Sequence, residues 1–197
     1  MSIGLEVKEV TTQSPHGIYL YDPSKDVWRL IATEGDPYIP KEDGAYVIYF
    51  DNTKCPACRR YDPIWFGYIR SVARKLENYR FVIVLCDWFA RECKSTAAAN
   101  TFRHYDVHAS PTTILLYVKN GKEVYRESYE GVLKEDELKA VVEGFVERAE
   151  KAMRGEKVEK PIKKEEADVA ELIKLLLAII KSVEKEERSA AQEQRKS

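Results

Sequence analysis

The chain has 197 residues, of which 44% are hydrophobic and 33% are charged, so it can hold one domain with a buried core and a smaller remainder. Its 32 basic and 33 acidic residues leave a net charge of -1. This balance argues against a nucleic-acid partner bound through bulk positive charge. Four cysteines are too few for a fold of this length that is stabilised mainly by disulfides. Their spacing is therefore more informative about their role than their number.

The sequence shows no export signal and no membrane span. Residues 1–10 lack a continuous apolar run, and the most apolar window, 172–180, is far shorter than the roughly 20 residues of a spanning helix. We therefore expect a cytoplasmic protein with no membrane partner. Lys and Glu are abundant while Asn and Gln are scarce. Such a thermophile-like composition is typical of proteins in which intracellular disulfides occur.

The first part of the chain, residues 1–44, predicts an N-terminal β extension. Residues 18–22 and 27–32 have the β-branched and aromatic side chains of strands, and residues 23–26 have turn chemistry. We expect these two strands to form a hairpin that leads into the main domain.

The second part, residues 45–153, has the strongest pattern and predicts an α/β domain. Apolar runs indicate buried strands, apolar residues at helical spacing indicate helices, and Asn120-Gly121 is a strong hairpin signal. The expected strands are 46–50, 81–85, 113–118 and 124–129, and the expected helices are 58–76, 94–105 and 136–153. The first two strands alternate with helices and the last two form a hairpin, so the sheet should be mixed.

The third part of the chain predicts a linker, a helix and a tail. Residues 154–167 are charged and contain Pro161, which is typical of a linker. Residues 168–185 carry apolar side chains every three or four positions, which predicts a helix, and residues 186–197 form a polar tail. The apolar face of this helix needs a partner. It can fold back on the domain, form a homodimer, or dock on a partner protein.

The Cys-Pro-Ala-Cys motif at 55–58 is the feature that points to chemistry. It follows a buried strand and opens a helix, and its spacing brings both sulfurs within disulfide reach across the first helical turn. The helix N-terminus and the basic residues beside the motif favour a thiolate at the first cysteine. We therefore predict that Cys55 is the nucleophile and Cys58 the resolving thiol.

These features together resemble the thioredoxin superfamily. Pro63 is similar to the proline that kinks the family's active-site helix, and Ser110-Pro111-Thr112 is similar to its cis-proline loop. Residues 119–122 resemble the hairpin that follows, and Gly131 resembles the glycine that ends the last strand. The resemblance covers residues 45–153. It implies an α/β, thioredoxin-like fold with a mixed central sheet flanked by helices, here with an N-terminal hairpin extension and a C-terminal helix.

The resemblance also implies a function, a thiol–disulfide oxidoreductase that acts on protein disulfides or dithiols through Cys55 and Cys58 and needs no cofactor. The residues implied to contact an extended substrate segment are Pro56, Ala57, Ser110 and Pro111. A reductase or another electron donor would be a second partner. The alternative is a non-catalytic redox-sensing or assembly module, whose C-terminal helix mediates dimerisation or docking.

Three positions depart from the thioredoxin pattern. Tyr49 stands where thioredoxins have a buried acid, Lys54 stands where they have tryptophan, and Pro56-Ala57 is more similar to glutaredoxin-like proteins. These departures argue against a general reductant that is recycled by thioredoxin reductase. They also leave the proton acceptor for Cys58 open, with Asp51 a candidate by its nearness in sequence.

The second cysteine pair, Cys86 and Cys93, has two open interpretations. The two residues form a second disulfide, structural or redox-active, or they are buried free thiols. A zinc site shared with the Cys-x-x-Cys motif is less consistent with the sequence, since six residues separate this pair and zinc ligands are usually closer. We expect no metal.

Two further pairs of residues have alternative interpretations. His104 and His108 are either a metal-binding pair or, as we expect, surface histidines that end a helix. Trp88 and Phe89 are either packing residues or part of a substrate groove.

Overall fold

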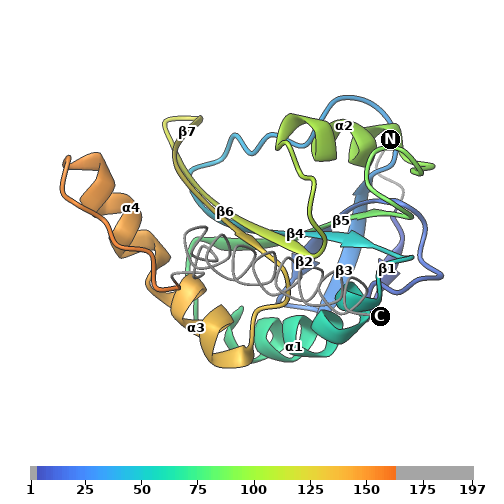
Figure 1. The fold of residues 1–197 in the computed structure, drawn as a ribbon, viewed down its shortest axis with the longest axis horizontal. Helices are drawn as coiled ribbons and strands as arrows, with labels where there is room; N and C mark the ends of the chain where they lie inside the picture. The colour runs from blue at the N-terminus through green and yellow to red at the C-terminus, as the bar shows by residue number, and fades with distance from the viewer. Residues whose placement is uncertain (1–3, 163–197) are drawn as a thin grey trace, which may run out of the picture. The chain divides into compact units, whose positions relative to one another are not determined.

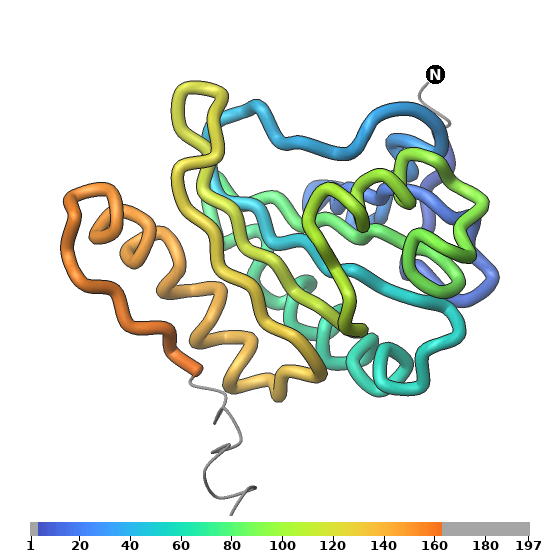
Figure 2. The backbone as a smooth tube through the Cα atoms, turned by 45° about the horizontal axis from the view of Figure 1, so that its top comes forward, coloured from blue at the N-terminus to red at the C-terminus, as the bar shows by residue number. Residues whose placement is uncertain are grey.

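A computed structural model of the protein describes residues 4–162 (Figures 1 and 2). Residues Met1–Pro161 form one compact unit. The second unit, Ile162–Ser197, contains the predicted helix 168–185 and the predicted tail, which lie outside the described residues. Over the range 4–162, no helix has the length and apolar character needed to cross a membrane.

Seven strands and four helices follow one another along the described residues. In chain order they are β1 (Glu6–Val7), β2 (Gly17–Asp22), β3 (Val27–Ala32), β4 (Gly44–Asn52), α1 (Pro56–Val72), β5 (Tyr79–Cys86), α2 (Thr96–His104), β6 (Thr112–Lys119), β7 (Lys122–Glu130), α3 (Glu135–Glu143) and α4 (Phe145–Met153). The strands that the sequence predicted are all present, most of them a residue or two longer at their ends.

The strands form a single sheet in the order β1-β3-β2-β5-β4-β6-β7. β4 and β5 are parallel, whereas β4 and β6, and β6 and β7, are antiparallel. The N-terminal hairpin of β2 and β3 continues the sheet, since β2 pairs antiparallel with β5. The prediction of a mixed α/β sheet is therefore confirmed.

The central strand β4 sets the two faces of the sheet. All nine of its residues are buried, which explains why the sequence shows a continuous apolar run rather than an alternating one. Successive side chains point to opposite faces. Ile48 and Phe50 join the apolar cluster that includes Phe102 of α2, whereas Tyr49 contacts Trp65 of α1.

Helices cover both faces of the sheet. Figure 1 shows α1 and α3 below the sheet and α2 above it, while α4 lies beyond the edge formed by β7. The tube view in Figure 2 shows the same division, with the 96–104 helix apart from the others. The connection from the carboxyl end of β4 to the start of α1 carries the Cys-x-x-Cys motif.

The prediction of one helix over 136–153 is wrong, because the chain forms α3 and α4 with a break at Gly144. The side chain of Arg148 folds into this break and donates to the carbonyl oxygens of Ala140 and Val141 at 3.4 and 2.6 Å. A Cβ atom at Gly144 would lie 2.7 Å from Nη1 of Arg148. The break is thus stabilised by a side chain that satisfies carbonyl groups at the end of α3.

The predicted Asn-Gly hairpin joins β6 and β7. Asn120 and Gly121 have φ angles of 53° and 70°, the left-handed backbone that a two-residue hairpin turn requires. At the other end of β6, the peptide bond between Ser110 and Pro111 is cis. The carbonyl oxygen of Ser110, on the near side of this bond, contacts Cys55 at the N-terminus of α1.

Candidate functional site

The two cysteines of the motif lie at the N-terminus of α1. Cys55 is the N-cap of the helix, and Pro56 and Ala57 form its first turn. The sulfur of Cys55 accepts a hydrogen bond from the backbone N–H of Cys58 at 3.2 Å. Both cysteines are free thiols, with Cys55 4% exposed and Cys58 fully buried. Of the two, only Cys55 has surface open to a partner.

The surroundings of Cys55 favour its thiolate. Burial acts to raise the pKa of this thiol, but hydrogen bonds from Cys58, from Ser110 and from the backbone of Ala57 lower it below its ordinary value. A cysteine at a helix N-cap is also stabilised as an anion by the free amides and the helix dipole. Cys55 therefore has the properties of a nucleophile.

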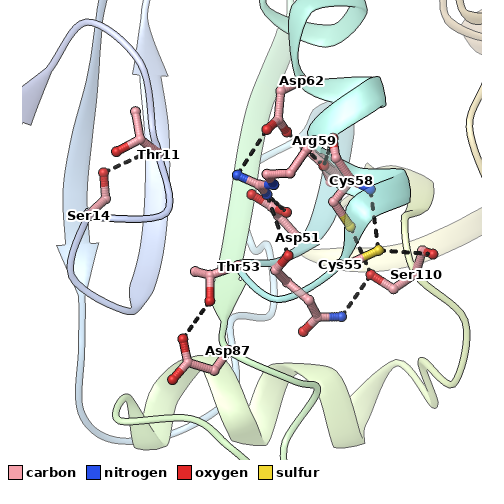
Figure 3. A network of polar contacts seen from close by, with 12 residues as sticks. Thr11, Ser14, Asp51, Thr53, Cys55, Cys58, Arg59, Asp62, Asp87 and Ser110 are labelled. Carbon is pink, nitrogen blue, oxygen red and sulfur yellow. Dashed lines mark hydrogen bonds and ion pairs between the residues drawn. The ribbon is translucent and has the colours of Figure 1, made fainter.

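The surroundings of Cys58 have the opposite effect. Burial raises the pKa of Cys58 well above its ordinary value, and the charge of Asp51 adds to the rise. The Cys58 sulfur lies 2.9 Å from the hydroxyl oxygen of Ser110 (Figure 3). Cys58 therefore stays protonated under conditions in which Cys55 forms a thiolate, so Cys55 is the more reactive sulfur of the two.

The cis-proline loop lies against the dithiol. As a thiol, Cys55 donates to the carbonyl oxygen of Ser110 at 3.5 Å. The carbonyl of Pro111 accepts from the N–H of Gly131 at 2.7 Å, which ties the loop to the residue that follows β7. Thus residues more than fifty positions apart in the sequence meet at the motif, as the resemblance predicted.

A largely buried charged cluster, Asp51, Arg59 and Asp62, lies beneath the first turns of α1 (Figure 3). The Arg59 guanidinium pairs with Asp51, whose side chain is 2% exposed, and with Asp62 at 3.0 Å. Burial and the neighbouring Asp51 raise the pKa of Asp62 to about 7. The hydroxyl of Tyr49 donates to Asp62 at 2.9 Å. Tyr49, at the position of the thioredoxin acid, thus contacts a carboxyl group supplied by the helix.

Sequence reasoning missed Asp62 and Arg59 as parts of this cluster. The available signal was their spacing along α1: Asp62 lies four positions after Cys58 and three after Arg59, and residues three or four apart are neighbours on a helix surface. Asn52 was also missed. It is fully buried at the end of β4 and donates to the Ser110 hydroxyl at 2.7 Å, and its signal was a polar residue ending an apolar strand.

Cys86 and Cys93 are joined in a disulfide, with their Cα atoms 4.7 Å apart. The loop that this disulfide closes contacts the segment before the motif. The carboxylate of Asp87 accepts from the hydroxyl of Thr53 and contacts the His16 ring at 3.1 Å. The Cys86–Cys93 disulfide therefore closes a loop that contacts the segment leading into Cys55.

The remaining sequence candidates make no hydrogen bond to the sulfurs of Cys55 or Cys58 within residues 4–162. His108 is largely exposed and pairs with Asp106 at 2.6 Å, and His104 is exposed on the last turn of α2. Within residues 4–162, no three His, Cys, Asp or Glu side chains are grouped to hold a metal ion. Trp88 is 37% exposed, and it lines a cavity of about 270 Å³ with Phe89 and His108.

Comparison with known proteins gives matches only to solved structures. No model of a known protein family matches the chain, and no curated protein matches it. Thioredoxin from Aeropyrum pernix is 20% identical, with a TM-score of 0.40 over 73% of this chain and 97% of that one. Thioredoxin-2, a component of malaria parasite protein secretion machinery, is 18% identical, with a TM-score of 0.38 over 58% and 97%. StoA from Bacillus subtilis is 15% identical, with a TM-score of 0.37 over 51% and 83%.

These identities are too low to transfer a function, so the class of protein follows from the fold itself. A parallel β4–β5 pair is joined through α1, and an antiparallel β6–β7 hairpin lies beside β4 and is followed by α3. A cis-proline begins β6 next to the dithiol. The chain therefore has a thioredoxin-like fold, as the resemblance predicted, extended at one edge by the strands β1 to β3.

Proposed function

We propose that this protein is a thiol–disulfide oxidoreductase that exchanges disulfides with protein substrates through Cys55 and Cys58. The observation that supports this most strongly is the asymmetry of the pair. Cys55 caps α1 with a lowered pKa and has some exposed surface, while Cys58 is fully buried with a raised pKa. An attacking thiolate beside a resolving thiol is the arrangement that such exchange requires.

The reaction runs in two steps. The Cys55 thiolate attacks one sulfur of a substrate disulfide, so that a Cys55–substrate bond forms and the substrate's own S–S bond breaks. The displaced substrate sulfur leaves as a thiolate and takes up a proton. Cys58 then loses its proton and attacks Cys55, which forms the Cys55–Cys58 disulfide and releases the second substrate thiol. Two electrons pass to the substrate, and the reverse sequence oxidises a substrate dithiol.

The cis-proline loop supplies the surface for the substrate. Among residues 4–162, the backbone N–H of Ser110 donates no hydrogen bond, and the carbonyl oxygen of Ser110 accepts one only from Cys55. An extended segment of a substrate can pair with this backbone as an added strand. Pro56, which is exposed, and Ala57 border the same surface at the start of α1. Recognition through backbone groups fits an enzyme that accepts more than one protein.

The proposed cycle needs a partner that restores the dithiol. We propose a dithiol reductant or a reductase as the electron donor, acting on the Cys55–Cys58 disulfide by the same exchange chemistry. The cytoplasmic location and the role of the C-terminal helix in dimerisation or docking are predictions from the sequence.

Reduction of insulin disulfides by a dithiol reductant tests the proposed function. We expect the wild-type protein to accelerate the reaction and Cys55→Ser to abolish the acceleration. Cys58→Ser should instead accumulate a mixed disulfide through Cys55, because the resolving thiol is missing. The matched control is Lys122→Ser, an exposed position on β7 away from the motif, and we expect it to keep full activity. Full activity of Cys55→Ser would show that the proposed function is wrong.

A further inference from the structure

Asn52 is a buried polar residue whose hydrogen bonds lead to the resolving sulfur. It is the last residue of β4 and is fully buried. Its Nδ2 group donates to the hydroxyl oxygen of Ser110 at 2.7 Å, and its Oδ1 atom accepts from the backbone N–H of Phe89 at 2.6 Å. Both ends of the carboxamide are therefore bonded to groups close to the dithiol.

The contact with Phe89 fixes which end of the carboxamide faces Ser110. A backbone N–H can only donate, so the oxygen of Asn52 must face Phe89 and the NH2 group must face Ser110. Phe89 has a φ angle of 52° and lies in the loop that the Cys86–Cys93 disulfide closes. This loop therefore holds Asn52 in one orientation.

The orientation of Asn52 determines what the Ser110 hydroxyl can do. A serine hydroxyl has one hydrogen and two lone pairs, and one lone pair receives the N–H of Asn52. The hydrogen and the second lone pair are left for the sulfurs of the motif, and the Cys58 sulfur lies 2.9 Å away. Once Cys55 is bonded to substrate in the mixed disulfide it is no longer a thiolate, and Cys58 is the sulfur that the hydroxyl can stabilise. The hydroxyl can thus accept from the Cys58 thiol and, by rotating, donate to its thiolate. The bond from Asn52 polarises the hydroxyl and makes it a stronger donor.

We propose that Asn52 is a positioning residue for the resolving step, which it assists by holding Ser110 so that the hydroxyl stabilises the Cys58 thiolate. This inference rests on the proposed exchange function. In the step concerned, the Cys58 sulfur attacks Cys55 of the mixed disulfide. The Cys55–Cys58 bond forms, the Cys55–substrate bond breaks, and the proton lost by Cys58 ends on the departing substrate sulfur. The Ser110 hydroxyl accepts a hydrogen bond from the Cys58 thiol before the proton leaves and donates one to the Cys58 thiolate afterwards.

Reaction with an aromatic disulfide, 5,5′-dithiobis(2-nitrobenzoate), separates the two steps. Attack by Cys55 releases one coloured thiolate in a first phase, and attack by Cys58 on the mixed disulfide releases a second. We expect Asn52→Leu to slow the second phase by about tenfold, because the Ser110 hydroxyl is then no longer held to donate to the Cys58 thiolate, a hydrogen bond to a charged group. The first phase should change by less than about twofold. The pH midpoint of the second phase should rise by about one unit.

The Ser110→Ala variant shows whether Asn52 acts through the hydroxyl. We expect Ser110→Ala to slow the second phase as well, Ser110→Thr to restore it, and the double variant with Asn52→Leu to be no slower than Ser110→Ala alone. If Asn52→Leu does not fold, Asn52→Asp keeps the oxygen that faces Phe89, and its second phase should also move to higher pH.

Three results would overturn the inference. They are an unchanged second phase in the Asn52 variant, equal slowing of both phases, and slowing by Asn52→Leu that multiplies the slowing by Ser110→Ala. A failure of the proposed function is visible separately. If the proposed exchange function is wrong, the first phase of the wild-type protein is no faster than the reaction of a cysteine in an unstructured peptide, or it persists in Cys55→Ser.

Discussion

Replacement of Arg59 by methionine removes the only cation of the buried cluster beneath the motif. Arg59 pairs with Asp51 and Asp62, whose side chains are 2% and 16% exposed. Methionine keeps an unbranched apolar stem of similar length, so packing changes little. The variant isolates the effect of leaving a buried carboxyl group, Asp51, and a partly buried one, Asp62, without a counter-ion.

The expected loss of stability follows from the burial of this cluster. Removing one partner of a buried ion pair costs about 3–5 kcal/mol. The side chain of Arg59 is itself 28% exposed, and water reaching this end of the cluster weakens the interaction. We therefore expect the free energy of unfolding to fall by the lower figure, about 3 kcal/mol, at neutral pH.

The loss should depend on pH in a definite direction. Burial and Asp51 already raise the pKa of Asp62 to about 7, and removal of Arg59 raises it further. A carboxyl group whose pKa is higher in the folded protein than in the unfolded chain destabilises the fold increasingly as pH rises above the unfolded value, about 4. The loss in Arg59→Met should therefore be larger near pH 8 than near pH 5.

Urea unfolding of both proteins at these two pH values measures the effect. Arg60→Met is the matched control, because Arg60 is exposed one position along the same helix, and we expect it to change stability by less than about 0.5 kcal/mol. Adding Asp51→Asn to Arg59→Met should recover part of the loss. A loss below about 1 kcal/mol, or one that is equal at both pH values, would refute the reasoning.

Three other predictions concern the remaining cysteines and a second buried ion pair. Replacing Cys86 and Cys93 by serine opens a loop whose ends are seven positions apart, so urea unfolding should show a loss of about 2–3 kcal/mol; unchanged stability would contradict a disulfide here. In the wild-type protein, the guanidinium of Arg148 donates to the carboxylate of Glu127 at 2.7 and 2.8 Å. Glu127→Gln removes this charge partner and should lower the free energy of unfolding by about 3–5 kcal/mol in the same assay. A loss below about 1 kcal/mol would contradict the role of this pair. Alkylation of Cys55 by iodoacetamide, followed by peptide mass spectrometry, should reach half its maximal rate at a lower pH than alkylation of a cysteine in an unstructured peptide, because the pKa of Cys55 is lowered. A midpoint at or above that of the peptide would count against the stabilisation of the thiolate at the helix N-cap.

The sheet and the dithiol could be predicted because their signals are local. A strand such as β4 appears as an apolar run, and the turn at Asn120-Gly121 needs only two residues. The position of Cys55 at a helix start follows from the motif and the strand before it. In each case the residues that determine the structure are neighbours in the sequence.

The features that could not be predicted depend on contacts between distant residues. The break at Gly144 is stabilised by Arg148, which is also bonded to Glu127 on β7. Asn52 faces Ser110, 58 positions away, and nothing in the sequence specifies this pairing. The same holds for Tyr49, whose hydroxyl meets the carboxyl group of Asp62 only because β4 lies beneath α1.

The reduction potential of the Cys55–Cys58 pair tests the central claim most directly. The protein is equilibrated with glutathione buffers over a range of ratios, its free thiols are trapped, and Cys55→Ser serves as the control. The account predicts a reversible two-electron couple near the potential of glutathione, absent from the variant and accompanied by turnover of a model disulfide. A pair that stays oxidised at every ratio and turns over no disulfide would be a structural clip, and would contradict the account.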